Sequence, residues 1–364
     1  MQPDSTIPLV DWKKLREFMI RIFTAVDMPE EDAIIEADSL IWANLRGVDS
    51  HGVVRVPWYV DNVALGVMNP RPNMRVIAET PATVFLEADK AFGPVATVHA
   101  TELAMSRAAA TGVGWVLIRN LTHQGAIGQY AQMIARQDMI GLVVCAGQPN
   151  MVPYGAKVSG MGNNPIAICV PADHHHHVLL DMATSLVALG KVLVARESGV
   201  PMPEGWGMDK DGNPTTDPSQ LAALMPMAGP KGSGMALVFE CLSSVLASNA
   251  LVLPVLTGAF SGQKVSSSHV AQKAPHNQNS FVVALKIECF TGLNEFKAGV
   301  DDLIDAIKDL PKAAGFDEIA MPGELEERRC AERMKTGIPV PPGTVNGLKA
   351  IATRFGLELP PPLA

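Results

Sequence analysis

The chain contains few cysteines and lacks the spacing that a disulfide framework or a cysteine-based zinc site requires. Its five cysteines are odd in number, scattered, and form no Cys-x-x-Cys pair: Cys145, Cys169, Cys241, Cys289 and Cys330. A small secreted scaffold held by disulfides is therefore not expected. We expect reduced and mostly buried thiols, as in a cytoplasmic protein.

Long hydrophobic runs and an excess of positive charge are also missing. No apolar stretch reaches about 18 residues, so no transmembrane helix is expected, and the first residues lack the pattern of a signal peptide. The net charge of −8 argues against nucleic acid as the main partner. Hydrophobic residues make up 48% of the 364 positions, which excludes extensive disorder and suits a large core in two lobes.

The chain also lacks the glycine-rich fingerprint of Rossmann dinucleotide-binding domains. No Gly-x-Gly-x-x-Gly follows a predicted strand, because Gly160-Met161-Gly162 continues into Asn-Asn-Pro. The residues alone therefore lower the expectation of a Rossmann domain, and they do not predict a nicotinamide enzyme.

What is present is an alternation of helices and strands, which is typical of an α/β fold. Apolar residues at helical spacing predict helices near residues 12–23, 29–45, 93–112, 128–136, 185–197 and 231–250. Short apolar runs predict strands at residues 83–87, 115–118, 140–145, 166–170, 178–180 and 281–287. Helices are expected again around Leu303 and over residues 324–335 and 345–355.

Two segments lie outside this pattern. Residues 258–280 are rich in small and polar side chains and predict a long mobile loop, a candidate lid. Four consecutive histidines, from His174 to His177, lie between two predicted strands, where a hairpin turn is expected. Such a run can bind a metal ion. It lacks acidic or cysteine partners at ligand spacing, so a solvated turn is favoured and no metal site is assigned.

Residues 46–55, Arg-Gly-Val-Asp-Ser-His-Gly-Val-Val-Arg, concentrate the groups that an enzyme acting on a small acid needs. His51 can transfer a proton near neutral pH, and Ser50 beside it can orient the ring. Arg55 offers a planar fork that matches a carboxylate, and in a continuous helix it would lie one turn from His51. The alternative is a polar helix end capped by Gly47 with a histidine on the surface.

This segment closely resembles the signature of the type-2 malate/L-lactate dehydrogenase family. That family includes ureidoglycolate, sulfolactate and diketogulonate dehydrogenases and the cyclic imino-acid (piperideine/pyrroline-2-carboxylate) reductases. Further segments resemble the family in the same order, at residues 120–125, 162–167, 181–185, 205–206, 214–218, 231–234 and 322–324. The sequence departs from the usual pattern at Gln124, Asn163 and Ser233, where the family commonly has Phe, Thr and Tyr.

The resemblance implies an α/β fold with a non-Rossmann NAD(P)-binding sheet covered by helices, beside a largely helical lobe for substrate and dimerisation. Residues 1–75 would carry the catalytic signature, and residues 76–310 would bind NAD or NADP. Residues 311–364 would pack against the N-terminal lobe. A homodimer or a larger homo-oligomer is expected, because members of the family assemble in this way.

The resemblance also implies roles for single residues. His51 would be the proton donor and acceptor, oriented by Ser50 and Asp181, although Asp181 can instead cap the helix that starts near Ser185. His123 would bind the substrate or take the proton-transfer role itself. The substrate carboxylate would meet Arg55 and Tyr59. For the cofactor, NAD or NADP, the candidates are Asn164, Asp181, Met182, Ala183, Thr184, Ser185, Lys231, Gly232 and Ser233.

Residues 231–234 have a simpler alternative, a helix start with small residues for packing.

The predicted function is hydride transfer between nicotinamide and a small carboxylate substrate, a 2-oxo or 2-hydroxy acid. A cyclic 2-imino acid reductase and a non-catalytic protein that binds small acids are the alternatives. The intact Ser50-His51 pair favours an enzyme, because a degenerate relative should lose its proton donor first. Neither the substrate nor the choice between NAD and NADP follows from the residues.

Overall fold

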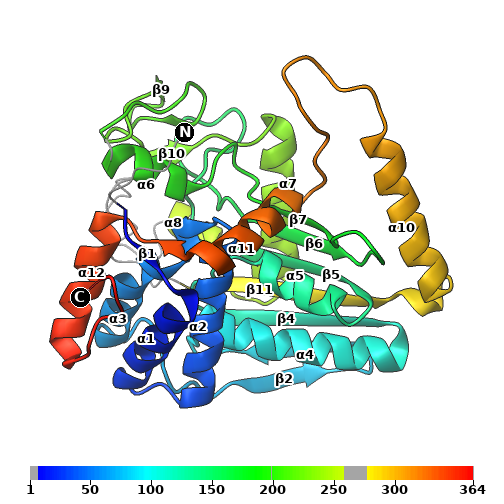
Figure 1. Cartoon of the computed structure of the whole chain (residues 1–364), viewed down its shortest axis with the longest axis horizontal. Helices are drawn as coiled ribbons and strands as arrows, with labels where there is room; N and C mark the ends of the chain where they lie inside the picture. The colour runs from blue at the N-terminus through cyan, green and yellow to red at the C-terminus, as the bar shows by residue number, and fades with distance from the viewer. Residues whose placement is uncertain (1–6, 198, 258–276, 364) are drawn as a thin grey trace.

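The computed structural model describes residues 7–197, 199–257 and 277–363, and a seven-stranded sheet forms its centre (Figure 1). β3 and β4 are parallel, and the other neighbouring strands are antiparallel. The predicted α/β fold is thereby confirmed as a mixed sheet with helices. In order across the sheet, the strands are β2 (Arg75–Glu79), β3 (Thr83–Glu87), β4 (Val113–Leu121), β11 (Gln278–Lys286), β5 (Met139–Ala146), β6 (Ile166–Val170) and β7 (Val178–Met182).

The strand β11 comes from the last third of the chain yet lies in the middle of the sheet. Its Phe281 pairs with Leu117 of β4 on one side and with Val144 of β5 on the other. β11 begins at Gln278, so the predicted end of the loop over residues 258–280 is wrong. Residues 258–276 of that loop lie outside the described part of the chain.

One face of the sheet is covered by α4 (Gly93–Thr111) and α5 (Gly128–Ala135). Every fourth residue of α4 is a fully buried alanine: Ala96, Ala100, Ala104 and Ala108. These small side chains let α4 approach the sheet closely. A Cβ at Gly114 of β4 would come within 2.0 Å of the carbonyl oxygen of Ala104, so only glycine fits there. This contact fixes the strand that delivers His123.

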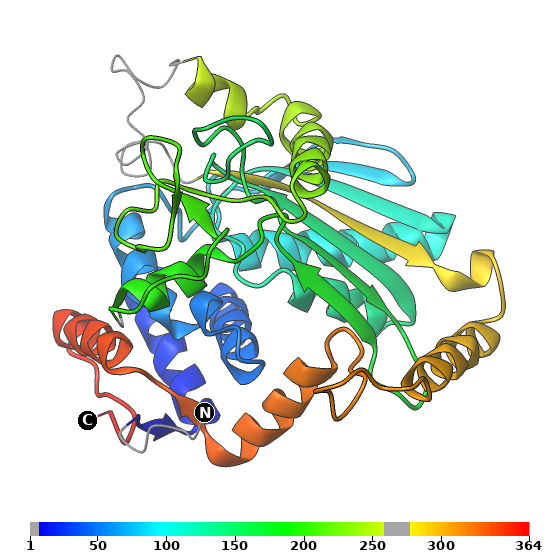
Figure 2. The same cartoon turned by 90° about the horizontal axis from the view of Figure 1, so that it is seen from above.

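The opposite face is covered by α7 (Pro230–Glu240) and the π-helical turn Cys241–Val245 that continues it (Figure 2). Met235, Phe239 and Ala247 pack here against the sheet. The predicted helix over residues 231–250 is therefore too long. The carboxylate of Glu240 accepts hydrogen bonds from the backbone of Leu251 and Val252, which bends the chain into a separate short helix, α8 (Val252–Leu256).

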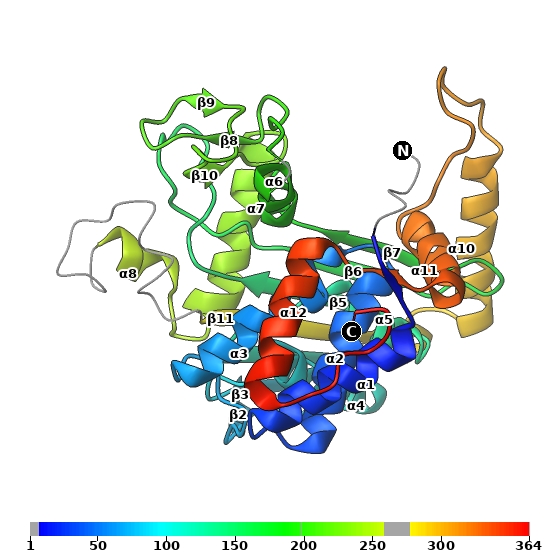
Figure 3. The ribbon, with the colours of Figure 1, turned by 60° about the vertical axis from the view of Figure 1, so that its left-hand side comes forward.

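The two ends of the chain build a second core together. Leu15, Phe18, Ile22 and Phe23 are fully buried, as their helical spacing predicts. Figure 3 shows α12 lying beside α1 and α3, and a short pair of strands, β1 (Leu9–Val10) and β12 (Ile338–Pro339), joins the ends. The helices of this core are α1 (Trp12–Ala25), α2 (Glu30–Leu45), α3 (Val56–Ala64) and α12 (Pro342–Phe355).

A third, smaller core surrounds Met151, Val192, Met202 and Leu224 above the sheet. It contains α6 (Leu189–Glu197), which begins four residues later than predicted, and a small sheet of β8 (Gly207–Met208), β9 (Pro214–Thr215) and β10 (Ala223–Leu224). Two further helices, α10 (Leu293–Lys308) and α11 (Glu324–Thr336), follow β11. Among the described residues, no helix is both long and apolar enough to cross a membrane.

All five cysteines are free thiols. Cys145 and Cys169 are buried, and burial raises the pKa of Cys169 to about 12. Cys241 and Cys289 are exposed, so the expectation of mostly buried thiols is wrong for these two. Both lie at the edges of elements, in the π-helical turn and after β11, where one side faces solvent.

Candidate active site

A cavity of about 700 Å³ lies where the N-terminal helices, the end of the sheet and the small upper core meet. It brings together six of the predicted site residues, which come from segments far apart in the sequence: His51, Arg55, His123, Asp181, Met182 and Ala183. Its volume lies within the usual range of ligand pockets, about 300–1,000 Å³. The cavity is therefore the candidate active site.

The signature segment enters this cavity as two tight turns and not as a continuous helix. The 3₁₀ helices Asp49–His51 and Val53–Arg55 are separated by Gly52, whose backbone is extended. The predicted one-turn helical spacing of His51 and Arg55 is therefore wrong, although both side chains still line the same cavity. Glycine interrupts a helix readily because it has no preference for helical dihedrals.

Contacts from the preceding helix α2 and from the distant helix α11 hold the signature segment in place. The side chain of Asn44 accepts a hydrogen bond from the backbone of Val53 at 2.9 Å and donates one to Asp49 at 2.6 Å. Arg333 of α11 holds the same Asp49 carboxylate with two bonds, at 2.7 and 3.0 Å. Nothing in the sequence around Arg333 pointed to this role, because the two partners are 284 residues apart.

His51 is paired with Ser50, as predicted. The Oγ atom of Ser50 lies 2.9 Å from Nδ1 of His51. Glycine at position 190 lets α6 close on this pair, because a Cβ there would come within 2.2 Å of the Ser50 Cβ. Burial, helped by the charge of Arg55, lowers the pKa of His51 to about 4. The ring is therefore neutral at pH 7 in the free protein.

Asp181 lies in the same cavity but is bonded elsewhere. Its Oδ2 atom accepts a hydrogen bond from the backbone of Gly128 at 2.9 Å, and its hydrogen bonds within the described residues do not include His51. Asp181 thus forms no direct hydrogen bond with His51, because its carboxylate is bonded to the backbone at the start of α5. Burial raises the pKa of Asp181 to about 6.

His123 stacks on His51, with ring centroids 5.4 Å apart and planes inclined by 18°. Its Nδ1 atom lies 2.7 Å from the hydroxyl of Tyr59 and accepts the backbone N–H of Gly125 at 3.3 Å. A backbone N–H can only donate, so Nδ1 is an acceptor, and the neutral ring carries its proton on Nε2. The geometry therefore presents His123 as a hydrogen-bond donor at Nε2.

Tyr59 itself is fully buried and does not line the cavity. Its predicted direct contact with the substrate is therefore not supported, because its hydroxyl is directed to His123.

Arg55, by contrast, lines the cavity. Its Nε donates to the carbonyl oxygen of Ser50 at 2.6 Å, while its two terminal nitrogens make no hydrogen bond to the described residues. That leaves one edge of the guanidinium for a carboxylate.

Only three of the nine candidate cofactor residues line the cavity: Asp181, Met182 and Ala183. Thr184 and Ser185 are buried behind them, and Ser185 donates to the carbonyl of Val187 at 2.7 Å. The amide of Asn164 is also buried and bridges Gly147 and Ala236. These residues shape the wall of the cavity from behind.

Residues 231–233 lie outside the cavity, at the start of α7. Lys231 is exposed, and Ser233 accepts a hydrogen bond from the backbone of Tyr154 at 3.0 Å. A Cβ at Gly232 would come within 2.4 Å of the carbonyl oxygen of Thr184. The arrangement fits the alternative of a helix start whose small residues serve packing.

Several arginines surround the cavity, and two of them were not predicted as site residues. Arg196 at the end of α6 lines it and is exposed. Arg46 also lines it, but it is almost fully buried, forms an ion pair with Glu327 and stacks on Trp42, 4.7 Å from the ring centroid. Arg46 is thus held by its own structural contacts, while Arg196 is a candidate for binding an anionic ligand.

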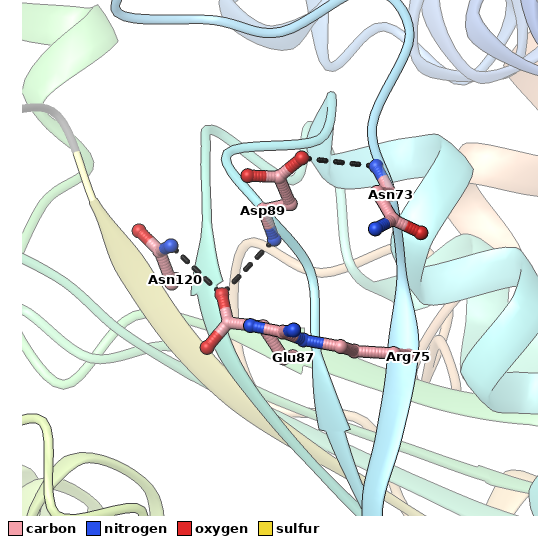
Figure 4. A pocket seen from close by; sticks show the side chains of 5 residues that line it. All are labelled: Asn73, Arg75, Glu87, Asp89 and Asn120. Carbon is pink, nitrogen blue, oxygen red and sulfur yellow. Dashed lines mark hydrogen bonds between the residues drawn. The ribbon is translucent and has the colours of Figure 1, made fainter.

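A second, polar hollow of about 300 Å³ lies near the exposed edge strand β2 (Figure 4). Glu87 is its centre and accepts bonds from Arg119 at 2.6 Å and Asn120 at 2.8 Å. Burial alone would raise the pKa of Glu87, but these hydrogen bonds hold it below the usual value. Asn120 is held at a φ of 59°, three residues before His123, so this network turns the chain toward the first cavity.

The chain is similar to known dehydrogenases over most of its length. Residues 10–349 match the model of the family described as malate/L-lactate dehydrogenase. The chain is 38% identical to the L-sulfolactate dehydrogenase of Methanocaldococcus jannaschii, over 94% of this chain and 96% of that protein. It is 34% identical to a ureidoglycolate dehydrogenase (NAD(+)) of Escherichia coli, over 86% and 87% of the two chains.

Solved structures agree with these sequence matches. The malate dehydrogenase of Pyrococcus horikoshii superposes with a TM-score of 0.86 at 34% identity, and the match covers 98% of this chain and 97% of that one. The M. jannaschii sulfolactate dehydrogenase superposes with a TM-score of 0.83, over 96% and 98% of the chains. Family model, relatives and structures all span nearly the whole length. The chain therefore belongs to the malate/L-lactate dehydrogenase family and is an oxidoreductase.

Proposed function

We propose that the chain is a cytoplasmic, NAD(P)-dependent dehydrogenase that interconverts a small 2-hydroxy acid and its 2-oxo acid. The observation that carries the proposal is the stacked His51–His123 pair beside Arg55 in one cavity. Reduction of a 2-oxo acid needs a carboxylate anchor, a hydrogen-bond donor at the ketone oxygen and a proton for that oxygen. Arg55, His123 and His51 offer these three groups in one cavity.

In this proposal each side chain has a separate task. The free edge of Arg55 binds the substrate carboxylate with two parallel hydrogen bonds. The Nε2–H group of His123 donates to the substrate oxygen, in the tautomer that Gly125 and Tyr59 impose. His51 gives the proton in reduction and takes it in oxidation, while Ser50 holds its ring.

The lowered pKa of His51 has a consequence for the order of events. With a pKa of about 4, His51 carries no proton to give in the free protein at pH 7. A substrate carboxylate bound at Arg55 would offset the arginine charge that disfavours the imidazolium. We therefore propose that His51 gains its proton together with the anionic substrate, which couples protonation to correct binding.

The residues around the cavity fit a nicotinamide cofactor. The Oδ1 atom of Asn277 and the Oγ1 atom of Thr184 are buried without a hydrogen-bond partner among the described residues, and Asn277 lines the cavity. We propose that residues 181–183 and Asn277 hold the nicotinamide end and that Arg196 meets a phosphate. Bound NAD or NADP supplies and accepts the hydride.

An exposed apolar surface supports assembly into a homodimer. The surface combines α7, the π-helical turn and α8, and its exposed apolar residues are Leu237, Val238, Leu242, Val245, Leu246, Leu253 and Leu256. Isolated apolar residues are ordinary on a monomer, whereas a contiguous group of them marks an interaction site. We propose that a second copy covers this surface. Light scattering at micromolar concentration would show a monomer if this is wrong.

The decisive experiment is a cofactor and substrate screen. NADH and NADPH are mixed with the protein and their fluorescence is followed, and their oxidation is then measured with a panel of 2-oxo acids and cyclic 2-imino acids. Turnover of a 2-oxo acid is expected. Turnover of cyclic imino acids alone would favour the imino-acid reductase, and small-acid binding without any nicotinamide binding would favour a non-catalytic binding protein.

A further inference from the structure

The turn between β6 and β7, residues 171–177, lies against α10 (Figures 1 and 2). Asp301 of α10 is 1% exposed, and its carboxylate accepts the backbone N–H groups of Asp173, His174 and His175 at 3.1, 3.1 and 3.2 Å. Burial would raise the pKa of Asp301, but these bonds hold it below the usual value. The turn is thus docked through its backbone on the carboxylate of Asp301, while the side chains of Asp173 and His174 stay exposed, in keeping with the predicted solvated turn.

Two of the four histidines converge on a second aspartate of the same helix. Asp305 lies four residues after Asp301, which places the two carboxylates on one side of α10. Nε2 of His175 lies 2.7 Å from one oxygen of Asp305, and Nε2 of His174 lies 3.8 Å from the other. The rings of His174 and His175 are 4.6 Å apart. One ligand atom from each of the three residues lies within 4.8 Å of the other two.

The tautomer of His174 is set by its other nitrogen. Nδ1 of His174 lies 2.8 Å from the Asp301 carboxylate, which can only accept, so the ring proton sits on Nδ1. The lone pair is then on Nε2, the atom nearest Asp305. Histidines that bind metals commonly donate their second N–H to a carboxylate in this way. The acidic partners that the sequence around the histidines lacks are supplied by α10.

We propose that His174, His175 and Asp305 bind one divalent transition metal ion, with Asp301 orienting His174 from behind. Two imidazole nitrogens and one carboxylate oxygen form a donor set that suits zinc, with ligand distances of about 2.0–2.2 Å. His174 and Asp305 are exposed, so water completes the coordination. The metal would join the β6–β7 turn to α10, two elements that are more than a hundred residues apart.

The test uses the full chain without an affinity tag, freed of metal with a chelator. Zinc is titrated at pH 7.5 against a chromophoric chelator, and cobalt is added in parallel to follow its visible absorption. We expect one equivalent of metal to bind, a tetrahedral cobalt spectrum and a higher unfolding temperature. Asp305→Asn should lose about 10- to 100-fold in zinc affinity, and Asp301→Asn, which removes the orienting partner, should lose less.

His176→Asn is the matched control, because His176 is exposed in the same run but lies outside the three-residue cluster. It should bind zinc as the unchanged chain does. Equal zinc affinity in Asp305→Asn and the unchanged chain would place the metal elsewhere and overturn the proposal. A chain that binds no zinc at micromolar concentration would overturn it too. Circular dichroism of each variant without metal checks that the fold is intact.

Discussion

Two pairs of histidines in this protein bring their rings close together in different surroundings. His51 and His123 stack at 5.4 Å inside the cavity, and His174 and His175 lie 4.6 Å apart on a surface turn. The cavity pair is held by the hydroxyls of Ser50 and Tyr59, whereas the surface pair is held by two carboxylates of α10. The two pairs thus differ in the groups that hold their rings, and these groups favour different chemistry.

The physical reason lies in charge. Burial, helped by the nearby charge of Arg55, favours the neutral imidazole, which is why the pKa of His51 falls to about 4. A neutral ring keeps a lone pair on one nitrogen, so it can accept a proton. Carboxylate partners instead favour a positive charge beside them, which suits the metal ion proposed for the surface pair. Substitutions and changes of pH act differently on these two environments.

Replacing His51 should have the largest effect. We expect His51→Asn to reduce kcat by about 10²–10⁴-fold, the usual contribution of general acid–base catalysis, with little change in nicotinamide binding. His99→Asn, on the exposed side of α4, is the control and should be silent. Steady-state kinetics and fluorescence titration measure both. If His123→Ala abolishes turnover at saturating substrate while His51→Asn retains most of it, the two roles are reversed.

The pH dependence tests the same assignment. Because the pKa of His51 is about 4 in the free protein, its basic form is fully present at neutral pH. For oxidation of the hydroxy acid, kcat/KM should therefore not report His51 between about pH 7 and 9, where Asp181, with a pKa of about 6, is also ionised. For reduction, kcat/KM should fall about tenfold per pH unit, because the proton must be acquired. A step near pH 7 in oxidation would contradict the lowered pKa.

Arg55→Lys should have the next largest effect. A lysine keeps the charge but cannot make two parallel hydrogen bonds to a carboxylate. Charged hydrogen bonds contribute about 1.5–3 kcal/mol, so we expect KM for the acid to rise about 10- to 100-fold. Arg75→Lys, on the exposed strand β2, is the matched control. An unchanged KM in Arg55→Lys would show that the carboxylate binds elsewhere.

Tyr59→Phe should have a smaller effect, because the backbone N–H of Gly125 still bonds to Nδ1 of His123 when the tyrosine hydroxyl is removed. Loss of one bond costs about 1 kcal/mol, which corresponds to about a fivefold lower kcat/KM. The backbone of Gly125 still holds the tautomer, so the shape of the pH profile should not change. A purely structural role would lower the unfolding temperature without changing kcat/KM at 25 °C. Thermal unfolding and kinetics together distinguish the two.

Glu36→Gln should have the smallest effect, and it acts on stability. Glu36 is fully buried in α2, neither carboxylate oxygen has a partner among the described residues, and burial raises its pKa well above the usual value. A raised pKa means that its neutral form stabilises the fold below about pH 4 and that this stability is lost as pH rises through the folded pKa. Glutamine cannot ionise, so it should stabilise the fold at pH 8.

We expect a gain on the order of 1 kcal/mol at pH 8, or about 2 °C in the unfolding temperature, that disappears near pH 4. Glu17→Gln, on the exposed side of α1, is the control and should show no such dependence. A gain that is equal at both pH values would mean that Glu36 does not titrate on unfolding. Glu36 also bears on the cavity pair, because a charge on Glu36 raises the pKa of Tyr59, the partner of His123.

Much of this protein could be predicted from local patterns. The strands Thr83–Glu87 and Ile166–Val170 and the helix Glu324–Thr336 lie where periodicity placed them, because alternation and helical spacing report which side of an element is buried. The motifs also identified His51, Arg55, His123 and Asp181, which the structure brings to one cavity. These are features of single segments, and short stretches of sequence contain them.

Partners from distant segments could not be predicted in this way. Local spacing did not show that Arg333 would hold Asp49, that Tyr59 would contact His123, or that α10 would bring carboxylates to the histidine turn. Nor did it show that the expected helix would be interrupted at Gly52, or that the backbone N–H of Gly128 would donate a hydrogen bond to the carboxylate of Asp181. The sequence by itself determined the residue types, the elements and the family, since these depend on neighbours along the chain. Only the tertiary structure decided which groups meet, because that depends on how separate elements pack.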